Sequence, residues 1–576
     1  MDEAKKSSLY IKNHSVFSDR IKAFLKKYHV IAIIFFVILL CKIIMESWIC
    51  DDAYHAFIMV RNLADGNGFV YNIGERVNAS TCPFYTLVVW LFYAVSGNMY
   101  MSGTISCILF SAAAVWIILF LICRGKPFLT AAVGMTMLFE KSFISFTTSG
   151  LENAMLFFLA SLFCLMLLRN PEDKKLKFGK LVGMALTVGI TAGTRMDAVL
   201  IYVPVCIAVY FFGAFTEVKW YKRWLAGFIG LSPFIAWLIF SLYYYGFFFP
   251  NTAYAKLNTG FPVSDYFVRG LRYVGYSFLF SPILLLTIVL FIVLAIVSKR
   301  KKHILIASGI AVYTIYIVRI GGDFMVGRHF TLCFFISVFC LADLAAHSHI
   351  YEKFVSKVES RISSGDGSKK NSYAKSLPVF ICLTGLVLFG IAGTLYHYTL
   401  PNYNVTGIAD EKEYYFSHNS LAAYIRYGES SVKNCFILPV EFDGNGGYLP
   451  FAPGIMLYYY AYGRNYFDEH GLGDALLARL PARYNPGWRI GHMRRTIPLG
   501  YNETVETGVN VIENEHLAEY YDKLKQVISG DLNAPGRMQL IIDFNLGKYD
   551  YLLEQYIEES KDLEVYYFSY EKAIGF

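Results

Sequence analysis

The chain has few charged residues for its length. Asp, Glu, Lys and Arg make up 17% of its 576 residues, whereas soluble domains contain roughly 25%. Hydrophobic residues make up 56%, and the mean hydropathy is +0.42. This composition excludes an ordinary soluble protein and predicts an integral membrane protein.

Features of other protein classes are missing as well. No glycine-rich loop of the Rossmann or P-loop kind follows a predicted strand, so we do not expect a soluble domain that binds a nucleotide sugar. No internal repeat with a period of about 20–50 residues is present. Of the eleven cysteines, Cys50, Cys82 and Cys435 are expected outside the membrane. A Cys50–Cys82 disulfide and a free pair both remain open.

Positive charge is concentrated in four segments. Residues 1–29, 169–180, 299–302 and 351–375 carry net charges of +4, +3, +4 and +3, while the whole chain carries +8. Because Lys and Arg mark cytoplasmic loops, we place all four segments in the cytoplasm. Charges scattered between apolar runs are not typical of a nucleic-acid-binding face, so we expect no nucleic-acid partner.

Apolar runs long enough to cross a bilayer lie between these segments. We expect a multi-pass protein of the plasma membrane with eleven spans, a cytoplasmic N-terminus and an extracytoplasmic C-terminus. The predicted spans are about 30–49, 100–122, 128–146, 151–168, 181–196, 198–214, 223–245, 274–298, 303–320, 329–346 and 377–397. Residues 83–97 are short for a span, and we expect them to enter the membrane and return.

The predicted organisation has three parts. They are a basic cytoplasmic N-terminus (1–29), a membrane body (30–397) with an external loop (51–99) and a basic cytoplasmic loop (347–376), and an extracytoplasmic domain (398–576).

The extracytoplasmic domain is predicted to be mixed α/β. Strand-like runs at 434–440 and 538–544 alternate with a helix-like run at 514–528. Recognition of the acceptor is its expected role.

Ionisable residues of the membrane body gather at the external ends of the predicted spans. They are Asp51, Asp52, Glu152, Arg195, Asp197, Lys256, Asp323, Arg328 and His329. Such groups near hydrocarbon are costly and usually functional. Any single one could cap a helix or form an interfacial ion pair, but their gathering on one side predicts a common site.

The acidic pair Asp51 and Asp52 precedes a predicted helix. Apolar residues from position 53 to 64 keep helical spacing, and Asp-Gly-Asn-Gly at 65–68 ends the pattern. We expect this helix to lie along the membrane surface with its apolar stripe down. One Asp would suffice as an N-cap, so capping and a catalytic role both remain open.

A carboxylate beside several cations suits glycosyl transfer from a lipid-phosphate sugar. The carboxylate accepts the proton of the acceptor hydroxyl, and the phosphate leaves as a stable anion held by cations. We predict Asp51 or Asp52 as the catalytic carboxylate. The predicted phosphate-binding residues are Arg195, Lys256, Arg328 and His329.

Several motifs resemble GT-C fold membrane glycosyltransferases, most closely the mycobacterial terminal β-(1→2)-arabinofuranosyltransferase family. The first is DDAYHAFIMVRNLADGNGFVYNIGERVNASTCPFYTLV; the others are TSGLENAM, TRMDAVL, FPNTAYAKL, GGDFMVGRHF, GIADEKEYY (407–415) and DALLARLPARYNPGWRIGHMRRTIPLGY (474–501). They follow in order from about residue 50 to 501. The resemblance implies a GT-C body, a polyprenyl-phosphate sugar donor and an envelope glycan or glycolipid acceptor.

The resemblance also implies roles for individual residues. Asp51 or Asp52 would be catalytic, and the supporting residues would be Arg61, Glu75, Arg76, Glu152, Asp197 and Asp323. The chain reads Arg195-Met196-Asp197 where the family usually has R-P-D, and Thr81-Cys82-Pro83 where it often has T-N-P. Arabinofuranose is therefore a lead for the donor sugar rather than an assignment.

The stereochemical course stays open. Most GT-C enzymes invert, with the carboxylate acting as a base on the acceptor. The arabinofuranosyl family forms a β-linkage from a β-linked donor, which implies retention and allows an Asp to act as the nucleophile.

An aromatic and basic cluster lies in the last motif. Trp488 could stack on a sugar ring, and Arg489, His492 and Arg494 could bind hydroxyls or phosphates. A buried contact between domains is the alternative. His492 has no partner at metal-ligand spacing, so we predict no metal and no cofactor, with a divalent cation at Asp51 and Asp52 left open.

Two other functions remain as alternatives. A transporter or flippase of lipid-linked sugars would also have many spans, but its charges should lie near the midplane. A cell-envelope scaffold would have no need of acidic and basic groups that converge in the membrane body.

Overall fold

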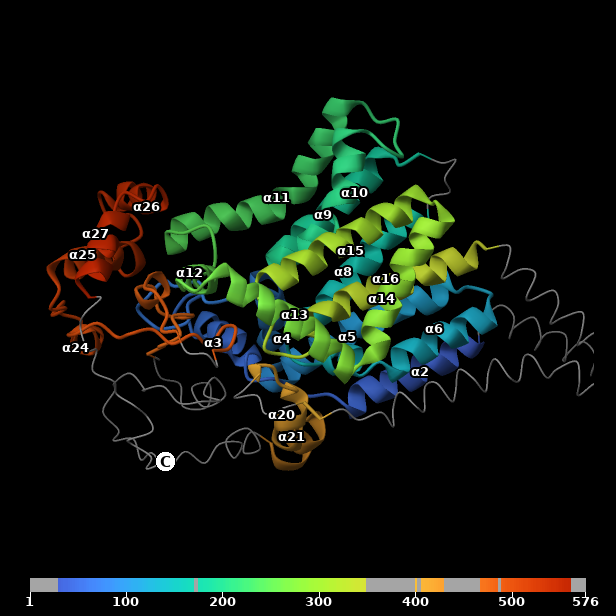
Figure 1. Ribbon diagram of the computed structural model, residues 1–576, viewed down its shortest axis with the longest axis horizontal. Coiled ribbons are helices and arrows are strands. Elements are labelled where there is room, and N and C mark those ends of the chain that lie inside the picture. Colours follow the sequence, from blue (N-terminus) through green and yellow to red (C-terminus); the bar gives the residue numbers. More distant parts are fainter. Residues whose placement is uncertain are drawn as a thin grey trace, which may run out of the picture.

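The computed structural model describes residues 30–169, 175–348, 399–400, 406–428, 467–484 and 488–560. Its regular elements are helices (Figure 1). The first half of the membrane body comprises α2 (Val30–Met45), α3 (Ala53–Ala64), α4 (Pro83–Ser96), α5 (Met99–Trp116), η1 (Ile117–Ile122), α6 (Pro127–Phe139), α7 (Lys141–Phe146), α8 (Asn153–Leu168) and α9 (Phe178–Thr194). The second half comprises η2 (Met196–Ile201), α10 (Val203–Cys206), η3 (Ile207–Phe211), α11 (Trp220–Tyr245), α12 (Asn251–Leu257), α13 (Val263–Phe280), α14 (Pro282–Ser298), α15 (Lys301–Arg319) and α16 (Arg328–Ala346).

The remaining described helices belong to the C-terminal part. They are α20 (Glu411–Asn419), α21 (Leu421–Tyr427), η4 (Leu477–Arg479), α24 (Tyr501–Thr507), α25 (Glu515–Ile528), α26 (Arg537–Asn545) and α27 (Asp550–Glu559). In the described ranges no strand occurs, and β pairing is limited to isolated bridges such as Trp48 with Ser420.

In the part of the chain that the structure describes, four helical segments are long and apolar enough to cross a membrane. They are Met99–Ile122, Trp220–Tyr245, Lys301–Arg319 and Arg328–Ala346, and α13 with α14 would form a fifth, bent by 107°. The prediction of a multi-pass helical membrane protein is thereby confirmed. The number of eleven spans and the orientation of the termini stay predictions, and the span predicted at 377–397 lies outside the described residues.

Two of the predicted spans are interrupted. The segment predicted as one span over 274–298 breaks at Ser281, because Pro282 begins α14 and cannot donate a backbone hydrogen bond to the preceding turn. The segment over 128–146 breaks at Glu140, whose carboxylate caps α7 by accepting from the backbone N–H groups of Ser142 and Phe143. Ser281 Oγ donates to Glu140 Oε1 at 2.5 Å, so the two breaks are joined.

Glycines allow several membrane helices to approach closely. A Cβ on Gly270 of α13 would overlap the backbone of Val318 on α15, and a Cβ on Gly230 of α11 would overlap Ala185 and Leu186 on α9. Small residues permit this kind of contact between helix backbones in membranes. The glycines therefore allow α13 to pack closely on α15 and α11 to pack closely on α9.

Replacement of Gly270 by Ala is expected to destabilise the folded protein. The added methyl group meets the Val318 carbonyl, and overpacking of this kind costs about 1–3 kcal/mol. Gly275→Ala on the same helix is the matched control, because its Cβ would meet nothing within 4 Å. Thermal unfolding of the purified protein measures both. Equal unfolding temperatures for the two variants would contradict the close packing of α13 on α15.

The described C-terminal part is helical. The helix predicted over 514–528 is confirmed as α25, capped by Asn514, whose side chain accepts from the Leu517 N–H. The strand predicted over 538–544 is wrong, because these residues form α26. Arg537 fixes the start of this helix by donating to the carbonyls of Val527, Tyr243 and Tyr244. The strand predicted over 434–440 lies outside the described residues.

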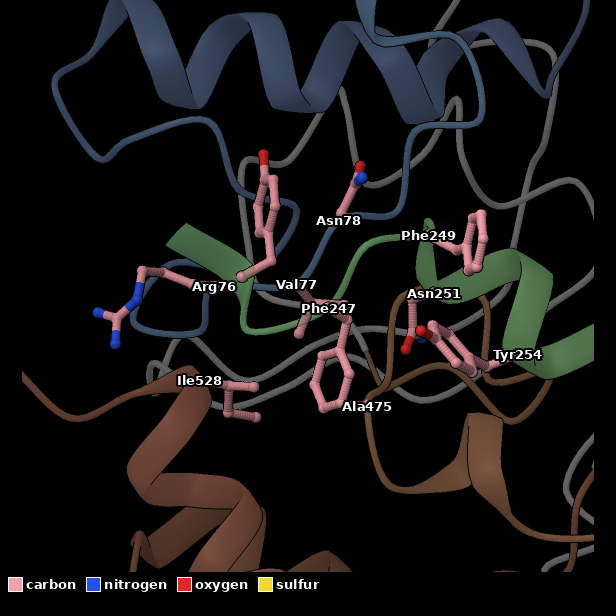
Figure 2. A pocket seen from close by; sticks show the side chains of 10 residues that line it. Arg76, Val77, Asn78, Phe247, Phe249, Asn251, Tyr254, Ala475 and Ile528 are labelled. Carbon is pink, nitrogen blue, oxygen red and sulfur yellow. The ribbon is translucent and has the colours of Figure 1, made fainter. Parts of the chain in front are cut away.

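The loop between α3 and α4 contacts both α11 and the C-terminal helices (Figure 2). The Arg76 backbone N–H donates to Ile528 O at 2.8 Å, and its guanidinium donates to Tyr244 O and Val527 O, each at 3.2 Å. Arg76 and Ile528 also line a cavity of about 10 Å³ with Phe247, Asn251 and Tyr254. This volume has room for about one water molecule, so the cavity marks a packed junction.

Candidate functional site

The helix after the acidic pair is present where it was predicted. α3 begins at Ala53, and Gly66 with φ +82° follows its end. It is more deeply buried than a helix on a membrane surface, because Tyr54, Phe57 and Met59 all lie in the core. The expectation of one apolar stripe on the membrane is therefore wrong, and the acidic pair lies half-buried at the start of α3.

The side chain of Asp52 is not a helix cap. It makes no capping hydrogen bond to α3, so the capping alternative is excluded for this residue. The pKa of Asp52 is raised overall, chiefly by burial and also by Asp323. The positive charges of Arg328, Lys256 and Arg489 act in the opposite direction and lower it. The carboxyl group thus lies among charged side chains that come from distant parts of the sequence.

Glu152 joins two arginines from different helices. It directly precedes α8, and its Oε1 accepts from Arg195 Nη1 at 2.6 Å and from Arg328 Nη2 at 3.1 Å. Arg195 precedes η2, and Arg328 is the first residue of α16. Ion pairs between buried groups hold side chains in one arrangement, because a charge without its partner would be costly.

Asp323 extends this network to a histidine. Its Oδ2 lies 3.5 Å from Arg328 Nη1 and 3.5 Å from His329 Nε2. Asp197 pairs with Arg195 Nε at 2.9 Å, and the Tyr313 hydroxyl lies 3.1 Å from His329 Nδ1. The predicted gathering of these ionisable residues is present in the structure.

Lys256 reaches the network from the short helix α12. The C-terminal chain holds this helix in place. The Asn251 amide donates to Gly471 O at 2.8 Å and to Asp474 O at 2.9 Å, and Arg495 donates to the Ala255 carbonyl. The position of Lys256 therefore depends on both parts of the molecule.

The ammonium group of Lys256 has no ion pair within 4 Å among the residues that the structure describes. Lys256 is exposed at the surface, but its ammonium group lies among other protein groups. The resulting loss of hydration lowers the pKa of Lys256, while Asp323 and Asp52 raise it. The cluster thus offers a cation whose charge is not matched by direct contact with a carboxylate.

Glu411 is a member of the site that the sequence analysis did not select. It begins α20 and is buried, with Oε1 3.5 Å from Arg489 Nη2. Burial raises its pKa to about 8; Arg489 lowers the value, and Asp52, Asp51 and Asp323 raise it. Burial and three acidic neighbours outweigh Arg489, because 3.5 Å is long for a charge-assisted hydrogen bond. Glu411 lies in the GIADEKEYY motif, which was the only signal in the sequence.

The Glu411→Gln variant is expected to be more resistant to unfolding at alkaline pH than the wild type. The folded pKa of about 8 exceeds the ordinary value of 4.5, so the folded state keeps a proton that the unfolded state releases. The free energy of unfolding then falls as the pH rises from about 4.5 to about 8.

Gln cannot ionise and should remove this part of the pH dependence. Unfolding temperature against pH measures it, with Glu413→Gln, an exposed neighbour on α20, as the control. If both variants follow the wild-type curve, Glu411 is charged in the folded protein.

Other predicted site residues lie elsewhere or have different contacts. The indole of Trp488 is buried against Phe261 and Tyr266, with the Arg269 guanidinium 4.3 Å from its ring centre. Sugar stacking on Trp488 is therefore wrong, and the alternative of a buried contact is confirmed. Arg494 is exposed, 3.8 Å from Glu469. Arg489 and His492 join the site instead, with Arg489 Nη2 3.3 Å from His492 Nε2.

Two predicted supporting residues, Glu75 and Arg76, lie at the contact with the C-terminal helices. Arg76 contacts the C-terminal helices, and the pKa of its neighbour Glu75 is raised to about 7 by burial and by Asp474. Arg61 lies in the last turn of α3, away from its acidic end. Arg76 is better explained as part of the junction shown in Figure 2.

Cys50 and Cys82 are free thiols, so the disulfide alternative is not observed, and Cys435 lies outside the described residues. In the described ranges no group of three His, Cys, Asp or Glu side chains is arranged to hold a metal ion.

The fold and the site define a multi-pass helical membrane protein with a charged cluster where its helices end. The chain is similar to the terminal β-(1→2)-arabinofuranosyltransferases of Mycobacterium tuberculosis and Corynebacterium glutamicum. It is 27% identical to the first over 328 residues, which are 49% of this chain and 50% of the relative. It is 28% identical to the second over 329 residues, which are 50% of this chain and 47% of the relative. The chain thus spans about half the length of the curated relatives it matches.

These relatives are named glycosyltransferases, and the resemblance stated from the motifs is confirmed. No family model matches the chain. Among solved structures, ArnT from Cupriavidus metallidurans bound to undecaprenyl phosphate has a TM-score of 0.47 and 11% identity, covering 79% of this chain and 90% of ArnT. The oligosaccharyltransferase AglB from Archaeoglobus fulgidus has a TM-score of 0.44 and 12% identity, covering 87% of this chain and 69% of AglB.

Proposed function

We propose that the protein transfers a sugar from a polyprenyl-phosphate donor to an envelope glycan or glycolipid at the extracytoplasmic face of the plasma membrane. The observation that carries this proposal is the position of Asp52, which caps no helix and lies in the electrostatic field of Lys256 and Arg328. The similarity to named arabinofuranosyltransferases supports arabinofuranose as the first sugar to test.

In the proposed reaction the anomeric carbon is transferred between two oxygens. The bond from the anomeric carbon to the phosphate oxygen breaks, and a bond to the acceptor oxygen forms. Asp52 or Asp51 takes the proton of the acceptor hydroxyl, and the lipid phosphate keeps the electron pair of the broken bond. No general acid is needed, because the phosphate is a stable leaving group.

The cations have separate tasks in this proposal. Arg328 and Arg195 are held by Glu152, so they present a fixed positive charge. Lys256 has no such partner and is the group that we assign to the donor phosphate. Preorganised charge of this kind stabilises the leaving anion without reorganisation during the reaction. If the reaction retains configuration, one Asp attacks the anomeric carbon and displaces the lipid phosphate, which forms a glycosyl ester. The acceptor hydroxyl then attacks the same carbon, the ester bond breaks to release the Asp carboxylate, and the other Asp takes the hydroxyl proton.

Transfer by purified protein tests the proposal. The protein is given radiolabelled polyprenyl-phosphate sugars, with arabinofuranose, mannose and glucose as donors, and an envelope glycan as acceptor. We expect labelled glycan from one donor. If no donor yields labelled glycan while the folded protein binds polyprenyl phosphate, the transferase proposal fails and movement of intact lipid-linked sugar becomes the function to test.

A further inference from the structure

A second charged cavity lies on the other side of the first turn of α20. It has a volume of about 250 Å³. Asp410 lines this cavity, while the next residue, Glu411, interacts with Arg489 and the acidic pair. The two neighbouring carboxyl groups thus belong to two different spaces, and the start of α20 separates them.

The walls of this cavity carry three lysines and two acidic groups. Glu46 Oε2 accepts from Lys412 Nζ at 2.7 Å, and Glu46 Oε1 lies 3.4 Å from Lys42 Nζ. One carboxylate is therefore shared by two ammonium groups. Asp410 is the N-cap of α20, and its Oδ1 accepts hydrogen bonds from the backbone N–H groups of Lys412 and Glu413 at 3.1 and 3.3 Å. With Lys141 on a third wall, positive charge exceeds negative charge, and an anion would balance it.

Apart from Ser145, the rest of the lining is apolar. Phe139 is the last residue of α6, Ile144 lies in α7, and Phe280 is the last residue of α13. Exposed apolar side chains also occur on two of the helices that line the cavity, with Met45 at the end of α2 and Phe278 near the end of α13. A free inorganic anion would gain nothing from these surfaces, whereas a lipid chain would cover them.

The size of the cavity limits what it can hold. A water molecule occupies about 30 Å³ in the liquid, and pockets for drug-sized ligands measure about 300–1,000 Å³. The cavity therefore suits a phosphate group with the first part of its chain rather than a lipid-linked sugar. Lysine is a common phosphate ligand as a mobile point charge.

We propose that this cavity holds the phosphate of a polyprenyl phosphate, the lipid released by the transfer, with its first isoprenyl unit against Phe139 and Phe280. The identity of this lipid rests on the proposed function. The cavity then receives the product beside the reaction site and leaves Lys256 available for the next donor.

Binding of tritiated polyprenyl phosphate to the purified full-length protein in detergent tests this proposal. We expect the wild type to bind two molecules. In the double variant Lys42→Gln/Lys141→Gln, binding in the cavity should weaken at least about tenfold, while binding at Lys256 should be unchanged. In Lys256→Gln, binding at Lys256 should be lost and binding in the cavity should remain. Lys42→Arg/Lys141→Arg should bind as the wild type does, which separates the loss of charge from misfolding. Lys219→Gln/Lys222→Gln, two exposed lysines at the start of α11, is the matched control.

Unchanged binding in Lys42→Gln/Lys141→Gln would overturn the proposal. Competition gives a second test, since unlabelled polyprenyl phosphate should displace the label, whereas phosphatidylcholine and inorganic phosphate should not. Displacement by inorganic phosphate at the same concentration as the lipid would show a free-anion site and overturn the lipid assignment. Two bound lipids without sugar transfer would refute only the proposed function, and transfer with one bound lipid would refute only this cavity.

Discussion

The Asp52→Asn variant is expected to transfer sugar about 10²–10⁴-fold more slowly than the wild type, the range typical for loss of a catalytic acid–base group. The amide keeps the size of the side chain but cannot take a proton from the acceptor. Because Asp52 caps no helix, the change should leave the unfolding temperature close to that of the wild type. The initial rate of transfer at saturating donor and acceptor measures the effect.

Two controls accompany this variant. Asp65→Asn changes an exposed carboxylate at the opposite end of α3 and should leave the rate unchanged. Asp51→Asn tests the other member of the pair, and the variant with the larger loss identifies the proton acceptor. A wild-type rate in both Asp51→Asn and Asp52→Asn would remove the acidic pair from the mechanism.

The Lys256→Gln variant is expected to lose about 10²–10³-fold in kcat/KM for the donor, as when one preorganised group for a developing anion is removed. Lys256→Arg should recover part of the loss, because it restores the positive charge. The ammonium group of Lys256 binds the donor phosphate only while it is protonated. The pKa of Lys256 is lowered, and burial is the largest cause. Activity should therefore decline as the pH rises through this lowered pKa.

The pH profile separates phosphate binding from a structural role of Lys256. Arg stays charged in the alkaline range, so the alkaline decline should move to higher pH in Lys256→Arg. The exposed Lys222→Gln is the control for general loss of positive charge. An alkaline decline at the same pH in wild type and Lys256→Arg would contradict the assignment of Lys256 to the phosphate.

Much of the fold could be predicted from the sequence, because long apolar runs have few stable alternatives in a membrane. The breaks at Glu140 and Ser281 were missed, since hydropathy counts apolar residues and is insensitive to one capping group or one proline. The strand predicted at 538–544 failed for a different reason. A short apolar run fits both a strand and a buried helix, and the contacts of Arg537 with α11 decide between them.

The charged part of the site was predictable, because ionisable residues near the membrane are rare. Glu152, Arg195, Asp323 and Arg328 therefore stood out against an apolar background, and the structure brings them together. Glu411 could not stand out in the same way, since the stretch around it is polar throughout. Its place beside Asp52 follows only from the path of the chain after the membrane body.

The most direct measurement follows both halves of one donor. Polyprenyl-phosphate arabinofuranose carries ³H on the lipid and ¹⁴C on the sugar, and it is incubated with the protein in proteoliposomes together with an envelope glycan. The account predicts ¹⁴C in the glycan and ³H in free polyprenyl phosphate, with both formed about 10²–10⁴-fold more slowly by Asp52→Asn. Movement of both labels together across the membrane, with no ¹⁴C in the glycan, would contradict a transferase and establish a carrier of lipid-linked sugar.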